Sequence, residues 1–262
     1  MRNPDGTWDK SKLPSRRVTE GPERAPHRSY YYAMGLGSRE IAQPFVGVAS
    51  CWNQAAPCNT ALMRQANAAA EGVKAAGATP REFCTITVTD GIAMGHAGMY
   101  ASLPSREVIA DSVELTVRGH AYDALVGVAG CDKSLPGMMM AMLRLNVPSV
   151  FLYGGSILPG RWRGKDVTVQ AVFEAVGQHA AGKLDFEDLC DLERHACPGV
   201  GVARLVGRRQ RRGQRRGGGR PDREGYPSAR HLHAGGVRER RRGRGGDRRL
   251  DQRRPASAGH GQ

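Results

Sequence analysis

AYDALVGVAGCDKSLPGMMMAMLRLNVPSVFLYGG, residues 121–155, contains a complete strand–helix–strand unit. The apolar runs at 123–130 and 149–155 predict two buried strands, and the run PGMMMAMLRLN at 136–146 predicts the helix between them. Near-continuous apolar strands that alternate with helices are typical of a parallel sheet covered on both faces. We therefore predict an α/β protein with a parallel sheet and helices on both of its faces.

The same alternation extends in both directions from this unit. Upstream, FVGVAS at 45–50 and CTITVT at 84–89 predict strands, and the segments 59–78 and 104–122 predict helices. Downstream, two further helices are expected over 168–182 and 185–196. Together these segments predict a partial α/β domain over residues 41–202. The polar, proline-dotted residues 1–40 are expected to form an arm that wraps a partner surface.

Charge divides the chain at residue 202. Residues 203–262 hold 19 arginines and 5 acidic residues, which account for the whole net charge of +14. The same 60 residues have few large aliphatic side chains, so we expect a disordered, low-complexity tail rich in arginine and glycine. The chain shows neither a membrane-spanning apolar run nor a signal-peptide core, and we therefore expect a cytoplasmic protein that does not contact the membrane.

Chemically useful side chains gather where three predicted strands end. Cys58 follows the first strand, Asp90 follows the second, and Cys131, Asp132 and Lys133 follow the third. Since parallel strands end at one edge of a sheet, thiols and carboxylates would meet there, and these groups suit iron or zinc and magnesium or manganese. The alternatives are equally simple: buried apolar cysteines, a turn at Asp90 and a surface ion pair.

Four stretches together resemble the dihydroxy-acid dehydratase family, whose framework the sugar-acid dehydratases share. They are PFVGVASCWNQAAPCN, TVTDGIAMGHAGMYASLPSREVIADSVE, the stretch quoted first and ERHACPGVG. The resemblance implies a hydro-lyase that converts a small 2,3-dihydroxy acid to a 2-keto acid in the biosynthesis of valine and isoleucine. It also implies an iron–sulfur cluster (2Fe–2S in preference to 4Fe–4S), Mg²⁺ and a homodimeric intact enzyme.

Carried over residue by residue, the resemblance assigns roles to the residues at the strand ends. It makes Cys58 and Cys131 two cluster ligands, Asp90 and Asp132 magnesium carboxylates, and Lys133 a carbamylated magnesium ligand. The other four cysteines match no ligand position, and a structural role is expected for each of them: Cys51, Cys84, Cys190 and Cys197.

The family pattern breaks near residue 202. The third cluster cysteine is expected at about Ala203, and the general base is expected in a C-terminal part that this sequence does not contain. A frameshift near codon 202 would explain the change in composition, and we expect negligible activity from the chain as written. Two alternatives stay open: a sugar-acid dehydratase of the same superfamily, and a protein that binds nucleic acid non-specifically through its arginines.

Overall fold

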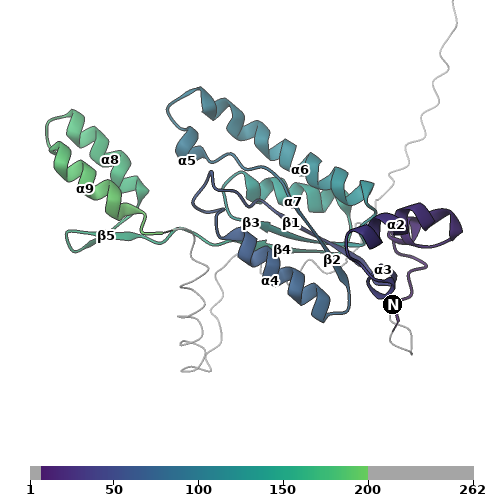
Figure 1. Ribbon diagram of the computed structural model, residues 1–262. Coiled ribbons are helices and arrows are strands. Elements are labelled where there is room, and N and C mark those ends of the chain that lie inside the picture. The colour runs from purple at the N-terminus through teal and green to yellow at the C-terminus, as the bar shows by residue number, and fades with distance from the viewer. Residues whose placement is uncertain (1–6, 200–262) are drawn as a thin grey trace, which may run out of the picture. The chain divides into compact units, whose positions relative to one another are not determined.

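The computed structural model describes residues 7–199 (Figure 1). The tail that was expected over 203–262 lies outside the described residues. In chain order the elements are α1 (Arg16–Thr19), η1 (Pro22–Arg24), α2 (Ala25–Ala33), α3 (Ser38–Ala42), β1 (Phe45–Ser50), α4 (Leu62–Ala75), β2 (Thr79–Cys84), α5 (Asp90–Ala93), η2 (Ala97–Ala101), α6 (Ser102–Gly119), β3 (Ala124–Ala129), α7 (Ser134–Leu145), β4 (Ser149–Tyr153), β5 (Gly160–Trp162), β6 (Lys165–Val167), α8 (Val169–Ala180) and α9 (Phe186–Ala196).

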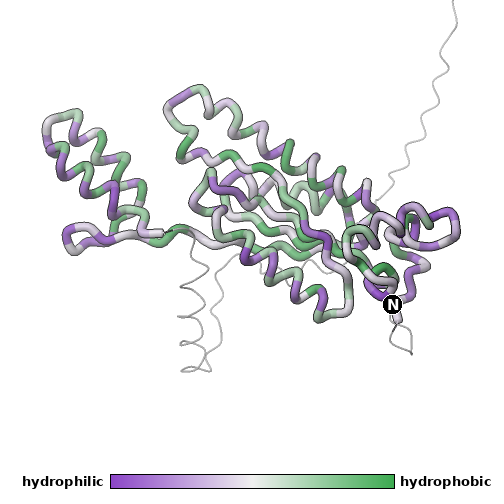
Figure 2. Tube along the Cα trace, viewed as in Figure 1, coloured by the Kyte–Doolittle hydropathy of each residue, from purple (hydrophilic) through white to green (hydrophobic). Residues whose placement is uncertain are grey.

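A four-stranded parallel sheet with the order β2-β1-β3-β4 forms the centre of the domain. Helix α4 contacts β1, β2 and β3 on one face, while α6 and α7 pack together on the other (Figure 1). The predicted fold class is therefore confirmed. The tube coloured by hydropathy shows mostly apolar residues along β1, β3 and β4 and helices of alternating character (Figure 2).

The core fills the two layers between the sheet and its helices. Its largest side chains with no more than 1% exposure come from strands and helices alike: Phe45, Leu62, Ile109, Leu125 and Met138. Glycine at position 127 lets α7 approach the sheet, since a Cβ there would lie 2.6 Å from Cγ of Met138 and 2.4 Å from Cε of Met142. This close approach packs the middle of α7 against β3.

The prediction for the second strand was wrong by about one strand length. The strand spans Thr79–Cys84, whereas residues 85–89 form a loop. The strand was missed because its residues Pro80, Arg81 and Glu82 are typical of a loop. They are tolerated because β2 lies at an edge of the sheet, where one side of the backbone needs no hydrogen-bonded strand partner. The short antiparallel pair β5–β6 was not predicted.

The described part of residues 1–40 packs onto this chain's own sheet. Asp123 accepts hydrogen bonds from the backbone N–H groups of Ser15 at 2.7 Å and Phe45 at 2.8 Å. The ammonium group of Lys10, a residue only 4% exposed, donates to Oγ1 of Thr19 at 3.0 Å and to two backbone carbonyls near the start of β1. These contacts fasten the segment to the amino ends of the strands, opposite the edge that carries the site; that it wraps a partner stays a prediction.

Helices α8 and α9 contact one another, and α9 also contacts β5. Both helices lie where the sequence predicted them, within one or two residues at each end. Among the described residues, no helix is both long enough and apolar enough to cross a membrane.

Candidate functional site

The loops that follow β1, β2 and β3 meet at the carboxyl edge of the sheet. The chain passes from β1 to the neighbour on one side, β2, and then to the neighbour on the other side, β3. The point where strand order reverses therefore lies between β1 and β3, which is where open α/β sheets bind ligands. Cys58 lies in the loop after β1, and Cys131 lies directly after β3, so the two thiols flank this point.

Lys133 joins the two carboxylates of the site. Its Nζ donates to Oδ2 of Asp132 at 2.8 Å and also to Oδ2 of Asp90, which lies 43 residues earlier in the chain. The side chains of Lys133 and Asp90 are each 20% exposed, so this ion pair is partly shielded from water. The structure thus brings Asp90, Asp132 and Lys133 together as the sequence predicted, although it does not test their chemical roles.

Charge coupling shifts the pKa of Lys133 upward and that of Asp132 downward. Hydrogen bonds to Asp132 and Asp90 raise the pKa of Lys133 and hold it as an ammonium ion. Burial acts to raise the pKa of Asp132, but the hydrogen bonds from Lys133 and Cys131 outweigh it, and the net shift is downward. The three groups therefore form a charged cluster with two carboxylates around one cation.

The position of Lys133 is unfavourable by the rules for helix ends. It is the N-cap of α7, where the helix dipole disfavours a cation, and its side chain makes no capping hydrogen bond. The two carboxylates offset this cost, because they supply the negative charge that the dipole would attract. A local rule broken within a compensating cluster is typical of a functional site.

The thiols of Cys58 and Cys131 interact beside this cluster, and each shifts the pKa of the other. The Cys131 thiol lowers the pKa of Cys58, while its interaction with Cys58 and its burial raise the pKa of Cys131. Sγ of Cys131 also lies 3.1 Å from Oδ1 of Asp132, which connects the sulfur pair to the carboxylates. Thiol sulfurs and carboxylate oxygens therefore lie next to one another at this edge of the sheet, as predicted.

Glycine at position 130 makes the approach of these two loops possible. A Cβ at Gly130 would lie 2.4 Å from the backbone oxygen of Cys58 and 3.4 Å from Cδ2 of Leu62. Real Cβ atoms do not approach a backbone oxygen this closely, so any side chain at this position must push the two loops apart. The glycine that precedes Cys131 thus positions the thiol pair.

Two serines that no sequence pattern singled out hold the site in place. Oγ of Ser102, at the start of α6, donates to Oδ1 of Asp90. Oγ of Ser134 donates to the backbone oxygen of Cys131 and accepts from its N–H, both at 3.0 Å, and Ser134 is fully buried. Their position at the first residue of α6 and of α7 is a signal that could have found them, because serine at a helix start bonds to nearby polar groups.

The remaining cysteines divide into buried and exposed thiols. Cys51 has no exposed surface, and burial raises its pKa to about 12, which fits the structural role expected for it. Cys84 and Cys197 are exposed, and Cys190 is half-buried. Residues 7–199 do not bring three or more cysteine, histidine or acidic side chains together as a group that could hold a metal by themselves.

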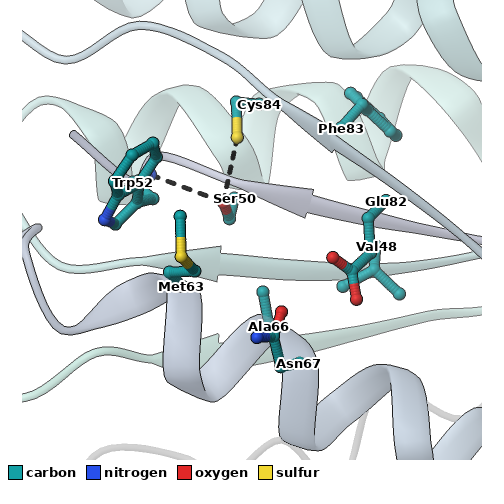
Figure 3. Close-up of a pocket in the computed structure, with 9 residues that line it drawn as sticks. All are labelled: Val48, Ser50, Trp52, Met63, Ala66, Asn67, Glu82, Phe83 and Cys84. Carbon is teal, nitrogen blue, oxygen red and sulfur yellow. Dashed lines mark hydrogen bonds between the residues drawn. The ribbon is translucent and has the colours of Figure 1, made fainter.

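A separate cavity of about 140 Å³ lies between α4 and strands β1 and β2 (Figure 3). The thiol of Cys84 lies 3.6 Å from Oγ of Ser50 in this cavity, and Glu82 lies toward its other end. Its lining consists of Val48, Ser50, Trp52, Met63, Ala66, Asn67, Glu82, Phe83 and Cys84. The cavity shares no residue with the cluster around Lys133, so we treat the two as distinct.

Comparisons with known proteins agree with this arrangement. The sequence profile of the dihydroxy-acid/6-phosphogluconate dehydratase N-terminal family matches residues 43–207. The chain is 77% identical over 196 residues to a dihydroxy-acid dehydratase of Parvibaculum lavamentivorans, covering 75% of this chain and 34% of the relative. It is 76% identical over 193 residues to dihydroxy-acid dehydratase 2 of Bradyrhizobium diazoefficiens and 57% identical over 190 residues to a dihydroxy-acid dehydratase of Natronomonas pharaonis.

The chain spans about a third of the length of the curated relatives that it matches. The profile match ends at residue 207, close to residue 202 where the composition changes. The match covers every strand of the central sheet and all three loops that meet at its carboxyl edge. The chain therefore belongs to the dihydroxy-acid/6-phosphogluconate dehydratase family, and it corresponds to the N-terminal region of that family.

Proposed function

We propose that this chain is the N-terminal region of a dihydroxy-acid dehydratase, a cytoplasmic hydro-lyase that converts a 2,3-dihydroxy acid to a 2-keto acid. The observation that carries the proposal is the cluster in which the ammonium group of Lys133 joins Asp90 and Asp132 beside the Cys58–Cys131 pair. Relatives that are 70–77% identical are named dihydroxy-acid dehydratases, which favours this substrate class over sugar acids.

The carboxylate cluster fits a magnesium ion. Carboxylate oxygens are the ligands that Mg²⁺ takes in proteins, and Asp90 and Asp132 already converge on one cation. Once the Lys133 ammonium group has lost a proton, its amine would attack carbon dioxide, form an N–C bond and release a second proton. The carbamate would then supply an oxygen ligand with negative charge in place of the cation. Magnesium bound there would fix the substrate carboxylate and stabilise the negative charge that develops when water is eliminated.

The side chains of the cluster have separate tasks in this proposal. Asp90 and Asp132 supply the charge that holds the cation and therefore place the acid group of the substrate. Ser102 keeps the Asp90 carboxylate oriented toward the cluster through its hydrogen bond to Oδ1. We assign no proton-abstracting residue within 7–199, since the general base is expected in the C-terminal part of the family.

The thiol pair by itself is too small a set to hold an iron–sulfur cluster. Such clusters take three or four protein ligands, and residues 7–199 bring together two thiols, those of Cys58 and Cys131. The third ligand of the family falls near Ala203, outside the described residues, and we derive no step through the cluster. With this ligand set we expect the chain as written to have negligible activity.

We also propose that residues after about 202 are read out of frame rather than selected as an arginine-rich tail. The support is that the change in composition coincides with the loss of the expected third cysteine. The nucleotide sequence of codons 198–210, translated in all three frames, tests this. A frame that continues the family sequence supports the proposal, and its absence from both alternative frames refutes it.

A chimeric enzyme tests the proposed function directly. Residues 43–199 of this chain would replace the matching segment of the Parvibaculum relative, and the product would be assayed with 2,3-dihydroxyisovalerate. We expect 2-keto acid formation close to that of the parent relative, a loss of at least 100-fold with Asp90→Asn, and little change with Asp166→Asn in β6. A folded, cofactor-loaded chimera that is inactive on this substrate, or that prefers a sugar acid, would contradict the proposal.

A further inference from the structure

Cys58 and Cys131 are two free thiols that the fold brings together from distant parts of the sequence. Residues 7–199 form no group of three or more potential metal ligands around them. A pair of neighbouring thiols has a chemistry that a single thiol lacks, because the two can be oxidised to a disulfide within one chain. The pair therefore has a possible reaction that does not depend on a bound metal.

The backbones that carry the two thiols are in contact. A Cβ at Gly130 would lie 2.4 Å from the backbone oxygen of Cys58, so the residue directly before Cys131 packs against the peptide group of Cys58. Of all the groups that influence either thiol, the other thiol has the largest effect. A disulfide needs Cβ atoms about 3.8 Å apart. Residues 51–61 form neither helix nor strand, so the loop that carries Cys58 can adjust to this spacing.

The two thiols differ in their access to solvent. Cys58 is half-buried, whereas Cys131 is only 4% exposed. The backbone around Cys131 is also fixed, because its N–H donates to Oγ of Ser134 at 3.0 Å. A reagent from solution therefore meets Cys58 first, and Cys131 lies behind it in the position of a resolving thiol.

The other four cysteines are less suited to pair with either thiol. Cys51 has no exposed surface, and burial raises its pKa to about 12, which makes it a poor nucleophile. Cys84 is exposed and lies beside Ser50 in the separate cavity. Cys190 lies within α9, and Cys197 is the C-cap of that helix. Within residues 7–199, the site at the carboxyl edge of the sheet thus offers one accessible thiol with one buried thiol next to it.

We infer that Cys58 and Cys131 form a reversible disulfide when the folded chain meets a small-molecule disulfide such as oxidised glutathione. Cys58 loses its proton to solvent, and the thiolate attacks one sulfur of glutathione disulfide; a new S–S bond forms, the old one breaks and a glutathione thiolate leaves. The thiolate of Cys131 then attacks Sγ of Cys58 and releases the second glutathione. In balance, two protein thiols are oxidised and one glutathione disulfide is reduced to two thiols.

This modification decides whether the edge of the sheet offers sulfur ligands. Metals bind cysteine as the thiolate, so the disulfide withdraws both sulfurs until a thiol reduces it. The inference does not rest on the proposed function, since it requires only the two thiols and the fold that places them together. Its test uses no enzymatic assay, and its failure would leave the proposed function untouched.

Peptide mass spectrometry of the full chain tests the inference. The reduced chain would be incubated with oxidised glutathione and EDTA, both under native conditions and in urea, then quenched with acid and mapped without reduction. In the native chain the Cys58–Cys131 disulfide should be about tenfold or more in excess of any other pairing, because the fold raises the effective concentration of one thiol at the other. In urea the pairings should spread over all six cysteines, and dithiothreitol should restore both native thiols.

Two serine variants separate the roles of the thiols. Cys131→Ser removes the resolving thiol, so a glutathione adduct should persist on Cys58. Cys84→Ser, the matched change at an exposed cysteine, should leave the Cys58–Cys131 disulfide unchanged.

A time course in the unmodified sequence gives the same information without a variant, since the adduct on Cys58 should rise and then fall as the disulfide appears. The inference would be overturned by a native chain in which Cys58 keeps its adduct, in which neither thiol reacts, or in which Cys58 or Cys131 pairs mainly with another cysteine.

Discussion

Replacing Gly130 with alanine should separate the two halves of the site. The new Cβ would lie 2.4 Å from the backbone oxygen of Cys58, about 1.0 Å inside the 3.4 Å at which ordinary van der Waals contact begins. Neither atom belongs to a flexible side chain, so relief requires movement of the loop that carries Cys58 or of the end of β3. Overpacking of this kind costs about 1–3 kcal/mol. Gly130 does not adopt a positive φ angle, and the cost is therefore steric.

A matched variant with the opposite expected sign exists on α4. Gly72 lies in the helix interior, and a Cβ added there would meet no atom within 4 Å, so Gly72→Ala should stabilise the protein by about 0.5–1 kcal/mol. Urea unfolding followed by circular dichroism would measure both changes. If Gly130→Ala proves neutral or as stabilising as Gly72→Ala, the close approach of the Cys58 and Cys131 loops is not a constraint of the folded protein.

Three further predictions concern the core, the charged cluster and the thiols. Leu62→Ala should lower the free energy of unfolding by about 2–5 kcal/mol in urea denaturation, because Leu62 is fully buried beneath the site; a loss below about 1 kcal/mol would contradict this packing. Lys133→Met should cost about 1–3 kcal/mol at neutral pH, since it leaves two carboxylates facing one another in a partly shielded site. The pKa of Asp132 is lowered, so its contribution to the free energy of unfolding is present above the unfolded pKa of about 4 and is lost as pH falls through the lower folded value. Lys133→Met should therefore flatten the fall in the free energy of unfolding between pH 7 and pH 3. An unchanged dependence on pH would refute the coupling between Lys133 and Asp132. Mass spectrometry after iodoacetamide treatment should find Cys84 alkylated and Cys51 protected until urea unfolds the chain, because burial raises the pKa of Cys51 to about 12; equal labelling in the native state would show that the core is open.

The parallel sheet could be predicted because its inner strands carry an unambiguous pattern. Strands β1 and β3 are covered on both faces, so nearly every residue in them is apolar and they read as buried runs. The edge strand β2 is half-exposed and contains proline and two charges, which is the pattern of a loop. The error at residues 84–89 follows from this difference, since the β-branched residues there have the composition of a strand although the strand itself ends at Cys84.

The candidate site could be predicted as a set of loops but not as a network. Parallel strands end at one edge, so the sequence pattern was enough to expect Cys58, Asp90 and Cys131 close to one another. Which atoms bond depended on distances set by packing. Ser102 and the glycine at 130 both lie within stretches that resemble the family, but their contacts were found only because the fold brings a distant residue against each of them.

The amino-acid sequence by itself determined the fold class, the family and the edge of the sheet where thiols and carboxylates gather. Those properties follow from local hydrophobic periodicity and from the identity of a few residues, which are present in the chain before it folds. Only the tertiary structure decided that Lys133 lies between two carboxylates, that Gly130 permits the thiols to meet, and that β4 keeps one side without a strand partner among the described residues. Each depends on contacts between residues far apart in the chain, whose distances no local pattern encodes.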